Sequence, residues 1–235
     1  NNKTKAVIIN SPNNPTGVVY SEDVIKRIAS ILDAKQKELG IDIYLLSDEP
    51  YRELVYIDFK YPFITNYYDN ALVLYSFSKS ISLPGERIGY ILVSSKCKEA
   101  SRVYKAICGS GRSMGFVCAS SLFQYAVPTF VNALSDVSKY KENRDLLQNG
   151  LKELGYECIP SDGAFYLFVK SLEKDARKFK EVAKKFNLLL VPSDSFGCEG
   201  YVRIAYCVSK KTIINSMSAF KKLKEYYDGG RKCQE

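Results

Sequence analysis

The first part of the chain combines two apolar runs with one amphipathic segment between them. Residues 5–10 form a short apolar run that ends at an Asn-Pro-Thr-Gly turn, which predicts a buried parallel strand. Residues 21–39 have apolar side chains at helical spacing and stop before Gly40, which predicts a helix. Residues 41–47 form the second apolar run. Strand, helix and strand within about forty residues predict a right-handed crossover unit of an α/β sheet.

Two more strands are predicted further along the chain, at residues 71–77 and 88–94. Open α/β sheets bind ligands at the ends of their strands, so the connection between these two strands is a candidate place for chemistry. Residues 96–154 have a mainly helical pattern that ends at Gly155. Within them, GSGRSMG at residues 109–115 matches no phosphate-binding glycine motif, and we expect a mobile turn between two lobes there.

The pattern changes after Gly155. Short apolar runs now alternate with amphipathic helical segments, and four strands are predicted, at residues 157–160, 164–169, 188–191 and 201–207. This alternation indicates a compact α+β domain. We therefore expect two domains, an α/β domain over residues 1–135 and a smaller C-terminal domain over residues 136–235.

The composition is typical of a cytosolic protein with a sizeable core. The chain has 235 residues, of which 46% are hydrophobic. No apolar run approaches the roughly 18 residues that a membrane helix needs, so we expect no membrane partner. The seven cysteines form no Cys-x-x-Cys pair, and an odd number is a poor basis for a disulfide framework. Reduced thiols and a cytoplasmic location are therefore expected.

The absence of histidine excludes several kinds of chemistry. Ser-His-Asp hydrolysis, Cys-His nucleophilic catalysis and histidine-ligated zinc sites all need an imidazole, and we expect no metal. A general base must then be a carboxylate, lysine, tyrosine or cysteine. The net charge of +8 comes from 34 basic residues that are scattered among 26 acidic ones. Because they are not clustered with aromatic residues, we expect no nucleic-acid partner.

Three short motifs hold the candidate chemistry: NNPTG at residues 13–17, DEPY at residues 48–51 and SFSKSISLPGERIG at residues 76–89. In the third motif, Lys79 lies beside hydroxyl side chains and Arg87 follows eight residues later. Such a lysine suits covalent bonding to a phosphorylated aldehyde. The three motifs, in this order, resemble those of the class I/II aminotransferases, the fold-type I enzymes that use pyridoxal 5'-phosphate (PLP).

The resemblance implies a fold and an activity. It covers roughly the C-terminal half to two-thirds of a family member, so residues 1–135 would be part of a fold-type I PLP-binding large domain, with a mostly parallel sheet and flanking helices. Residues 136–235 would be the smaller α+β domain. The implied reaction is PLP-dependent transfer of an amino group from an amino acid to a 2-keto acid, by a homodimer of the full-length protein. We expect this chain alone to be inactive, because the family's ring-stacking aromatic and phosphate-binding loop are not in it.

Alternatives from other functional classes stay open. A C–S lyase or a decarboxylase of the same fold would use the same PLP chemistry. The PLP-binding effector domain of a transcription regulator can also keep these residues, since a fold hosts many functions. A winged-helix segment upstream of residue 1 would favour the regulator.

Four residues of the third motif match the family's lysine and phosphate site. Lys79 matches the catalytic lysine that holds PLP as a Schiff base and then moves a proton between the substrate Cα and the cofactor. Arg87, Ser76 and Ser78 match the phosphate-binding positions, since a guanidinium and hydroxyl groups suit a dianionic phosphate. Taken singly, these residues have ordinary alternatives as a solvated lysine, a surface ion pair and strand-end caps.

The remaining candidates match the family's cofactor-ring and substrate sites. Asp48 matches the carboxylate that keeps the pyridine nitrogen protonated. Tyr51 and Asn14 match the groups that hydrogen-bond the phenolic oxygen of the cofactor. Arg203 lies in an apolar strand, where an unpaired guanidinium is costly, and matches the arginine that binds the α-carboxylate of the substrate. The alternatives are turn caps for Asp48 and Asn14 and an internal salt bridge for Arg203.

Overall fold

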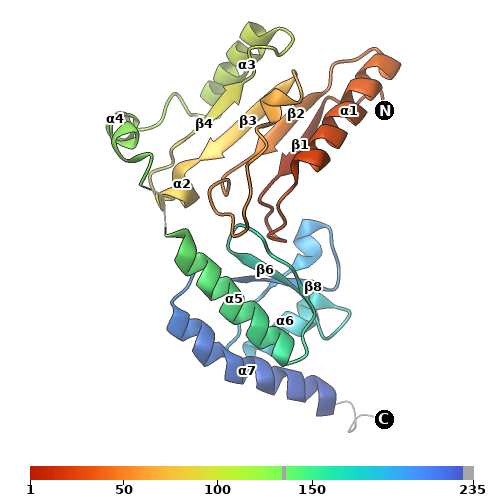
Figure 1. Ribbon diagram of the computed structural model, residues 1–235, viewed down its shortest axis with the longest axis vertical. Coiled ribbons are helices and arrows are strands. Elements are labelled where there is room, and N and C mark those ends of the chain that lie inside the picture. The colour runs from red at the N-terminus through yellow and green to blue at the C-terminus, as the bar shows by residue number, and fades with distance from the viewer. Residues whose placement is uncertain (134–135, 230–235) are drawn as a thin grey trace. The chain divides into compact units, whose positions relative to one another are not determined.

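The computed structural model describes residues 1–133 and 136–229, so Cys233 lies outside the described residues. The chain forms two compact units, each with its own sheet (Figure 1). The first unit comprises Asn1–Pro12, Tyr20–Glu53 and Asp58–Ser135. The second unit comprises Asn13–Val19, Leu54–Ile57 and Asp136–Glu235.

The sheet of the first unit has four strands in the order β1-β2-β3-β4. Their bounds are β1 Ala6–Asn10, β2 Tyr44–Asp48, β3 Ala71–Ser76 and β4 Gly89–Val93. Strands β1, β2 and β3 are parallel, and β4 pairs antiparallel with β3. The predicted mostly parallel α/β sheet is therefore confirmed, with one antiparallel edge strand that the apolar pattern alone did not indicate.

Helix α1 (Glu22–Leu39) packs on this sheet, along β1 and β2 in Figure 1. It begins because the Ser21 hydroxyl accepts a hydrogen bond from the Val24 amide, and it ends at Gly40, whose left-handed backbone closes the last turn. Its buried face, Ile25, Ala29 and Leu32, joins the sheet residues in one apolar core. The predicted crossover unit is thus present as β1, α1 and β2.

The rest of the first unit is helical and irregular. Its elements are the 3-10 turn η1 (Ile64–Asn66), the single-turn helix α2 (Phe77–Ser80), α3 (Ala100–Ser113) and α4 (Ser121–Phe130). The prediction of a mobile turn at residues 109–115 was wrong over most of its length, because α3 continues to Ser113. A glycine inside a helix costs only about 1 kcal/mol, so two of them do not end it.

The second unit has an antiparallel sheet in the order β5-β6-β8-β7. Its strands are β5 Cys158–Ile159, β6 Tyr166–Lys170, β7 Val191–Pro192 and β8 Tyr201–Ala205. Its helical elements are α5 Val137–Glu153, α6 Ala176–Lys184, α7 Lys210–Gly229 and the 3-10 turn η2 Ser193–Phe196. Helices α5 and α7 lie side by side (Figure 1). This is the α+β pattern that the residues after Gly155 predict.

Two early segments of the chain belong to this second unit. In segment 13–19, the Gly17 carbonyl accepts hydrogen bonds from the amides of Asp162, at 3.0 Å, and Gly163, at 2.9 Å. In segment 54–57, Val55 forms an antiparallel bridge with Gly163. Gly17 has a left-handed φ of 74°, and a Cβ there would lie 2.1 Å from the Ser161 hydroxyl oxygen. Only glycine therefore fits at this crossing.

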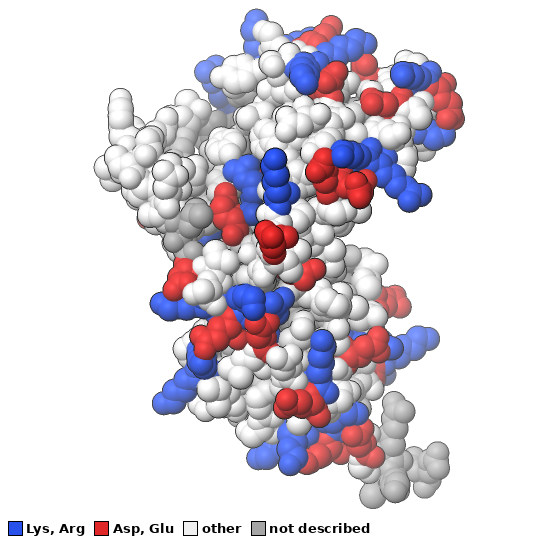
Figure 2. Space-filling model, in the orientation of Figure 1, with Lys and Arg blue, Asp and Glu red and all other residues white. Residues whose placement is uncertain are grey.

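The surface carries both signs of charge. Figure 2 shows basic and acidic side chains interspersed over the visible face of each unit, in agreement with the scattered charges of the sequence. Among residues 1–133 and 136–229, no helix is long and apolar enough to span a membrane.

Candidate active site

The carboxyl ends of the three parallel strands bring three polar side chains to one edge of the first sheet. Asn10 ends β1, Asp48 ends β2 and Ser76 ends β3. Asn10 and Asp48 are direct partners in the β1–β2 register. This edge is where open α/β sheets bind their ligands.

A cavity of about 800 Å³ lies at this edge. Asp48, Ser76 and Arg87 line it together. The other lining residues come from β3, from β4, from α3, which contains Arg112, and from the segment after α3. A cavity of this size is within the range of cofactor and small-molecule sites. The structure thus brings together a carboxylate, a hydroxyl and a guanidinium that lie far apart in sequence.

Asp48 is half-buried and held from one side. The Asn10 amide nitrogen Nδ2 donates to the Asp48 carbonyl oxygen at 2.8 Å and to its carboxylate Oδ2 at 3.3 Å. Burial raises the pKa of the Asp48 carboxyl above its usual value, because the charged form loses hydration. A cationic group in the cavity would stabilise the charged form of this carboxylate. Asn10 was missed at the sequence level. The signal that could have found it is its position at the end of the first predicted strand, which matches the position of Asp48 at the end of the second.

The turn that carries the candidate lysine begins at Ser76. The Ser76 hydroxyl caps α2 by accepting from the Ser78 amide at 3.2 Å, and the two hydroxyl oxygens lie 2.7 Å apart. Lys79 follows in the same turn. Both serines therefore lie within three residues of the lysine, as a phosphate site next to an attached cofactor requires.

Arg87 adopts a left-handed backbone, with φ of 52°, and lies two residues before β4 begins at Gly89. Its Nη1 donates to the Pro84 carbonyl oxygen at 2.8 Å. It forms no ion pair with any carboxylate in the described part of the chain, so its charge is available to an anion in the cavity.

Three of the predicted residues that belong to the first unit do not line this cavity. Among the described residues, the lining set includes neither Tyr51 nor Ser78 nor Lys79. Tyr51 is only 4% exposed and follows β2 by three positions, whereas Ser78 and Lys79 follow Ser76 in α2.

Two further candidates meet in the second unit. The Arg203 nitrogen Nη1 donates to the Asn14 side-chain oxygen Oδ1 at 2.9 Å. The guanidinium lies over the ring of Tyr166, at 4.4 Å from its centroid, and of Phe196, at 5.1 Å. Its buried Nε has no hydrogen-bond partner, and no carboxylate of the described residues pairs with it. The internal salt bridge considered for Arg203 is therefore not found in the described chain.

The donor set fits PLP. In the first unit, a half-buried carboxylate with a raised pKa suits a protonated ring nitrogen, and the hydroxyl and guanidinium suit a phosphate. In the second unit, a guanidinium framed by two aromatic rings suits a carboxylate.

Comparison with solved structures gives the class of fold. An amino transferase from Eubacterium rectale superposes with a TM-score of 0.94 at 54% identity, over 97% of this chain and 57% of the other chain. The aspartate aminotransferase of Thermotoga maritima superposes with a TM-score of 0.79 at 32% identity, over 94% of this chain and 56% of the other. The protein has the α/β fold of fold-type I aminotransferases.

Comparison of sequences gives the family. The family described as "Aminotransferase class I and II" matches residues 1–220, and the chain belongs to this family, whose members are PLP-dependent transferases. The aspartate aminotransferase of Pyrococcus horikoshii is 32% identical over 231 residues, which is 94% of this chain and 57% of that protein. The chain thus spans somewhat more than half the length of the curated relatives it matches.

Proposed function

We propose that the complete protein containing this chain is a PLP-dependent aminotransferase that moves an amino group from an amino acid to a 2-keto acid. The observation that carries this proposal is that Asp48, Ser76 and Arg87 line the same cavity. These three groups suit the ring nitrogen and the phosphate of one PLP molecule. Membership of the aminotransferase family supports the same reading.

In this proposal the phosphate is held beside α2. Arg87 supplies a guanidinium that has no carboxylate partner in the described chain, and Ser76 and Ser78 supply hydroxyl donors that already lie 2.7 Å apart. A fixed guanidinium with hydroxyl donors holds a dianion in position as well as balancing its charge.

Asp48 and Tyr51 act on the cofactor ring in this proposal. The Asn10 amide orients Asp48, whose carboxylate keeps a proton on the pyridine nitrogen. The resulting positive charge on the ring stabilises the charged form of this half-buried carboxylate, which burial disfavours. Tyr51 and Asn14 hydrogen-bond the phenolic oxygen.

Lys79 is the proposed catalytic residue. When bound, PLP supplies an electron sink that stabilises negative charge at the substrate Cα. Lys79 would hold the aldehyde carbon of the cofactor covalently, and once the amino acid has taken that place, its amine would remove the proton from the substrate Cα and hold it for return. A lysine amine can serve both as the covalent attachment point and as a proton carrier.

Arg203 is the proposed substrate-binding residue. Its guanidinium is framed by two rings and fixed by Asn14, so it presents a rigid planar donor pair to the α-carboxylate of the amino acid or keto acid. This arrangement selects for a carboxylate and leaves the side chain of the substrate to other residues. The names of the relatives suggest aspartate as the first donor to assay.

Reduction with borohydride followed by peptide mapping tests the proposal. The complete protein is incubated with PLP, reduced and digested, and we expect the pyridoxyl group on Lys79. Incubation with aspartate before reduction should release a 2-keto acid and leave the lysine unlabelled. A label on another lysine, or release of carbon dioxide in place of a keto acid, would overturn the assignment.

We further propose that the complete protein is a cytoplasmic homodimer. The α3–α4 region supports an interface, because Phe116, Val117, Leu122 and Tyr125 are 69–83% exposed and α4 contains no charged residue. The odd number of cysteines in the sequence and the absence of a Cys-x-x-Cys pair support a reducing compartment. We also assign residues 1–135 to the cofactor-binding large domain and residues 136–235 to the small domain.

A further inference from the structure

A buried ion network follows β2 in the first unit. The Glu49 side chain is fully buried, and its Oε2 lies 3.0 Å from Nη1 of Arg52. The Arg52 Nε lies 3.4 Å from Oε1 of Glu53. One arginine therefore lies between two carboxylates, and all three side chains are at least three-quarters buried. Such a network is rigid when each charge is paired.

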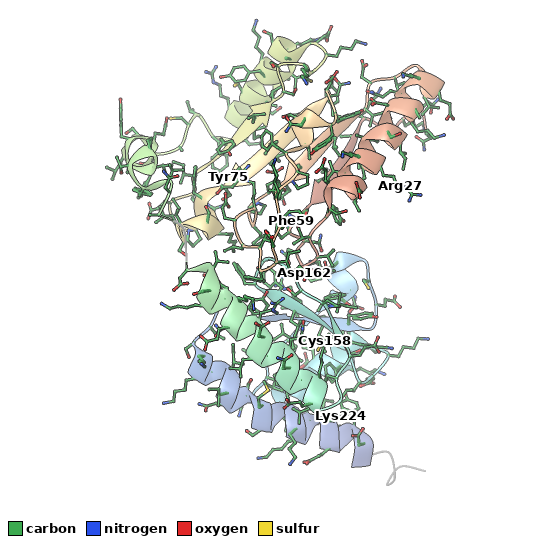
Figure 3. All side chains as sticks on the ribbon, viewed as in Figure 1. Arg27, Phe59, Tyr75, Cys158, Asp162 and Lys224 are labelled. Atoms are coloured by element: carbon green, nitrogen blue, oxygen red, sulfur yellow. The ribbon has the colours of Figure 1, made fainter. Side chains whose placement is uncertain are left out.

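Tyr75 lies on β3 (Figure 3). It joins this network to the lysine turn, the single-turn helix α2. Its hydroxyl oxygen lies 2.8 Å from Glu53 Oε1 and 2.8 Å from the Ser80 hydroxyl oxygen. A phenol carries one proton and a carboxylate only accepts, so Tyr75 donates to Glu53, and the Ser80 hydroxyl donates to Tyr75. Burial, with Glu53 beside it, raises the pKa of Tyr75 to about 12, which keeps that proton in place at neutral pH.

The ring of Tyr75 is also fixed. The Arg52 guanidinium lies 4.3 Å from its centroid, and the Tyr90 ring stacks on it at 5.0 Å. The Arg52 Nη2 donates to the Tyr90 hydroxyl at 3.0 Å, so the same arginine holds both rings. Phe77, the first residue of α2, contacts Tyr75 edge-on at 5.1 Å. The hydroxyl of Tyr75 therefore has a defined position.

Helix α2 is one turn long, from Phe77 to Ser80, and Lys79 is its third residue. A single turn has no neighbouring turns to hold it. The Phe77 amide donates to the Ile88 carbonyl oxygen at 3.1 Å and fixes the start of the turn, so its other end depends on side-chain contacts. Ser76 caps the first end. At the other end, Ser80 is only 2% exposed, and its hydroxyl bonds to Tyr75.

We propose that Tyr75 is a positioning residue for Lys79: through Ser80 it anchors the lysine turn to the Glu49–Arg52–Glu53 network. The inference rests on the proposed function, in which Lys79 bonds the cofactor and moves the Cα proton. Proton transfer requires an amine held at hydrogen-bond distance from the reacting carbon, and a small displacement of the turn slows it far more than it weakens binding.

Tyr75→Phe tests the link, because it removes the hydroxyl and keeps the ring packing. Tyr68→Phe is the matched control, since Tyr68 is a buried tyrosine of the same unit whose hydroxyl donates to the Ile43 carbonyl oxygen at 2.6 Å. In the complete protein we expect Tyr75→Phe to lower kcat about tenfold to a hundredfold while KM changes less than about threefold. Tyr68→Phe should leave both constants within about twofold of the parent.

A second readout does not depend on turnover. PLP is added to the cofactor-free protein, and the rate of covalent attachment to Lys79 is followed by absorbance across a range of pH. We expect Tyr75→Phe to slow attachment at least about fivefold and to shift its pH midpoint, whereas Tyr68→Phe should do neither. Equal behaviour of the two variants would overturn the proposal.

Ser80→Ala breaks the same link from the other side and serves if Tyr75→Phe does not fold. Its matched control is Ser94→Ala, which removes a buried hydroxyl that accepts from the Lys96 amide, away from α2. Because both variants cut one link, the double variant of Tyr75 and Ser80 should be no slower than the slower single variant. Additive losses would mean that the two hydroxyls act separately.

Lys79→Ala separates this proposal from the function on which it rests. If that variant still attaches PLP covalently, the assignment of Lys79 fails. If it loses attachment while Tyr75→Phe and Ser80→Ala behave like their controls, only the positioning role fails.

Discussion

Arg203 donates a hydrogen bond to Asn14 at 2.9 Å, although the two residues are 189 positions apart in the chain. The contact lies within the second unit, because segment 13–19 packs there with the C-terminal residues. Asn14 comes from the NNPTG motif that follows β1, and Arg203 comes from the centre of β8. A residue proposed to touch the cofactor is thus bonded directly to the residue proposed to bind the substrate.

Arg203→Lys should weaken binding of amino acids and keto acids much more than binding of PLP. A lysine ammonium is a point charge that cannot replace a planar guanidinium held between Tyr166 and Phe196. Loss of such a charge-assisted pair should cost about 2 to 5 kcal/mol. Titration of the PLP form with aspartate and with a keto acid gives the dissociation constants.

The control for this prediction is Arg177→Lys. Arg177 also belongs to the second unit and pairs with Asp194, but its side chain is 74% exposed. We expect no change in substrate affinity for this variant. An Arg203→Lys protein that binds several amino donors as tightly as the parent would show that Arg203 is structural.

Asp48→Asn should slow amino transfer severely and leave covalent attachment of PLP largely intact. The amide keeps the shape and can still accept from Asn10, but it cannot hold a proton on the pyridine nitrogen. Each tenfold loss of rate corresponds to about 1.4 kcal/mol of transition-state stabilisation. Single-turnover kinetics with one amino donor measure the effect, and a parent-like rate would remove Asp48 from the mechanism.

The same substitution should change the stability of the cofactor-free protein in a pH-dependent way. The pKa of Asp48 is raised by burial above its ordinary value of 3.8, so the folded state holds this proton more tightly than the unfolded chain. Stability falls as pH rises from the ordinary value through the raised pKa, and stays reduced above it. Asp48→Asn should therefore melt higher than the parent at neutral pH and lose that advantage in acid.

Thermal unfolding from about pH 3 to about pH 8 measures this difference. Asp58→Asn is the control, because Asp58 is an exposed carboxylate of the same unit. Its melting difference from the parent should not vary with pH. A constant difference for Asp48→Asn as well would mean that burial does not penalise its charge.

Gly17→Ala should destabilise the second unit by about 2 to 4 kcal/mol, from a positive-φ penalty and a clash together. At φ of 74°, a Cβ would lie 2.1 Å from the Ser161 hydroxyl oxygen. Ser161 is fully buried and bonds to Gly163, Tyr166 and Tyr206, so it has little freedom to move. Denaturant unfolding measures the loss.

Gly40→Ala is the matched control for the backbone term. Gly40 has a similar φ of 62°, but a Cβ there would meet nothing within 4 Å. We expect a loss of about 1 kcal/mol from the left-handed conformation alone. Equal losses at the two glycines would rule out the contact with Ser161 as a cause.

Much of the fold follows from local patterns of the sequence. Helix α1 was predictable because its cap and its terminal glycine agree with its helical pattern, and the structure confirms both ends. Its buried face is Ile25, Ala29 and Leu32, whereas the apolar residues Val24 and Ile31 are exposed, so the pattern did not predict which side faces the sheet. The direction of β4 was not predictable, since an apolar run looks the same in a parallel or an antiparallel strand. Nor was the membership of segments 13–19 and 54–57 in the second unit, because it depends on contacts distant in sequence.

The candidate site divides in the same way. Asp48, Ser76 and Arg87 could be found from motifs, and the structure brings them to one cavity. The Glu49–Arg52 pair was missed, because the burial of Glu49 is visible only once the strands have assembled. The sequence gives no sign that Tyr75 differs from its strand neighbours, because its hydrogen bond to Ser80 depends on the position of α2 beside β3.

Segments 13–19 and 54–57, which belong to the second unit, determine whether residues 136–235 could be transferred to another gene as a structural module. A gene fragment that starts at residue 136 would encode every helix of that unit. It would nevertheless lack Val55, the bridge partner of Gly163, and Gly17, whose carbonyl accepts two amides of the same turn. It would also leave Arg203 without Asn14. Recombination at that point would exchange sequence without transferring a self-sufficient structural module.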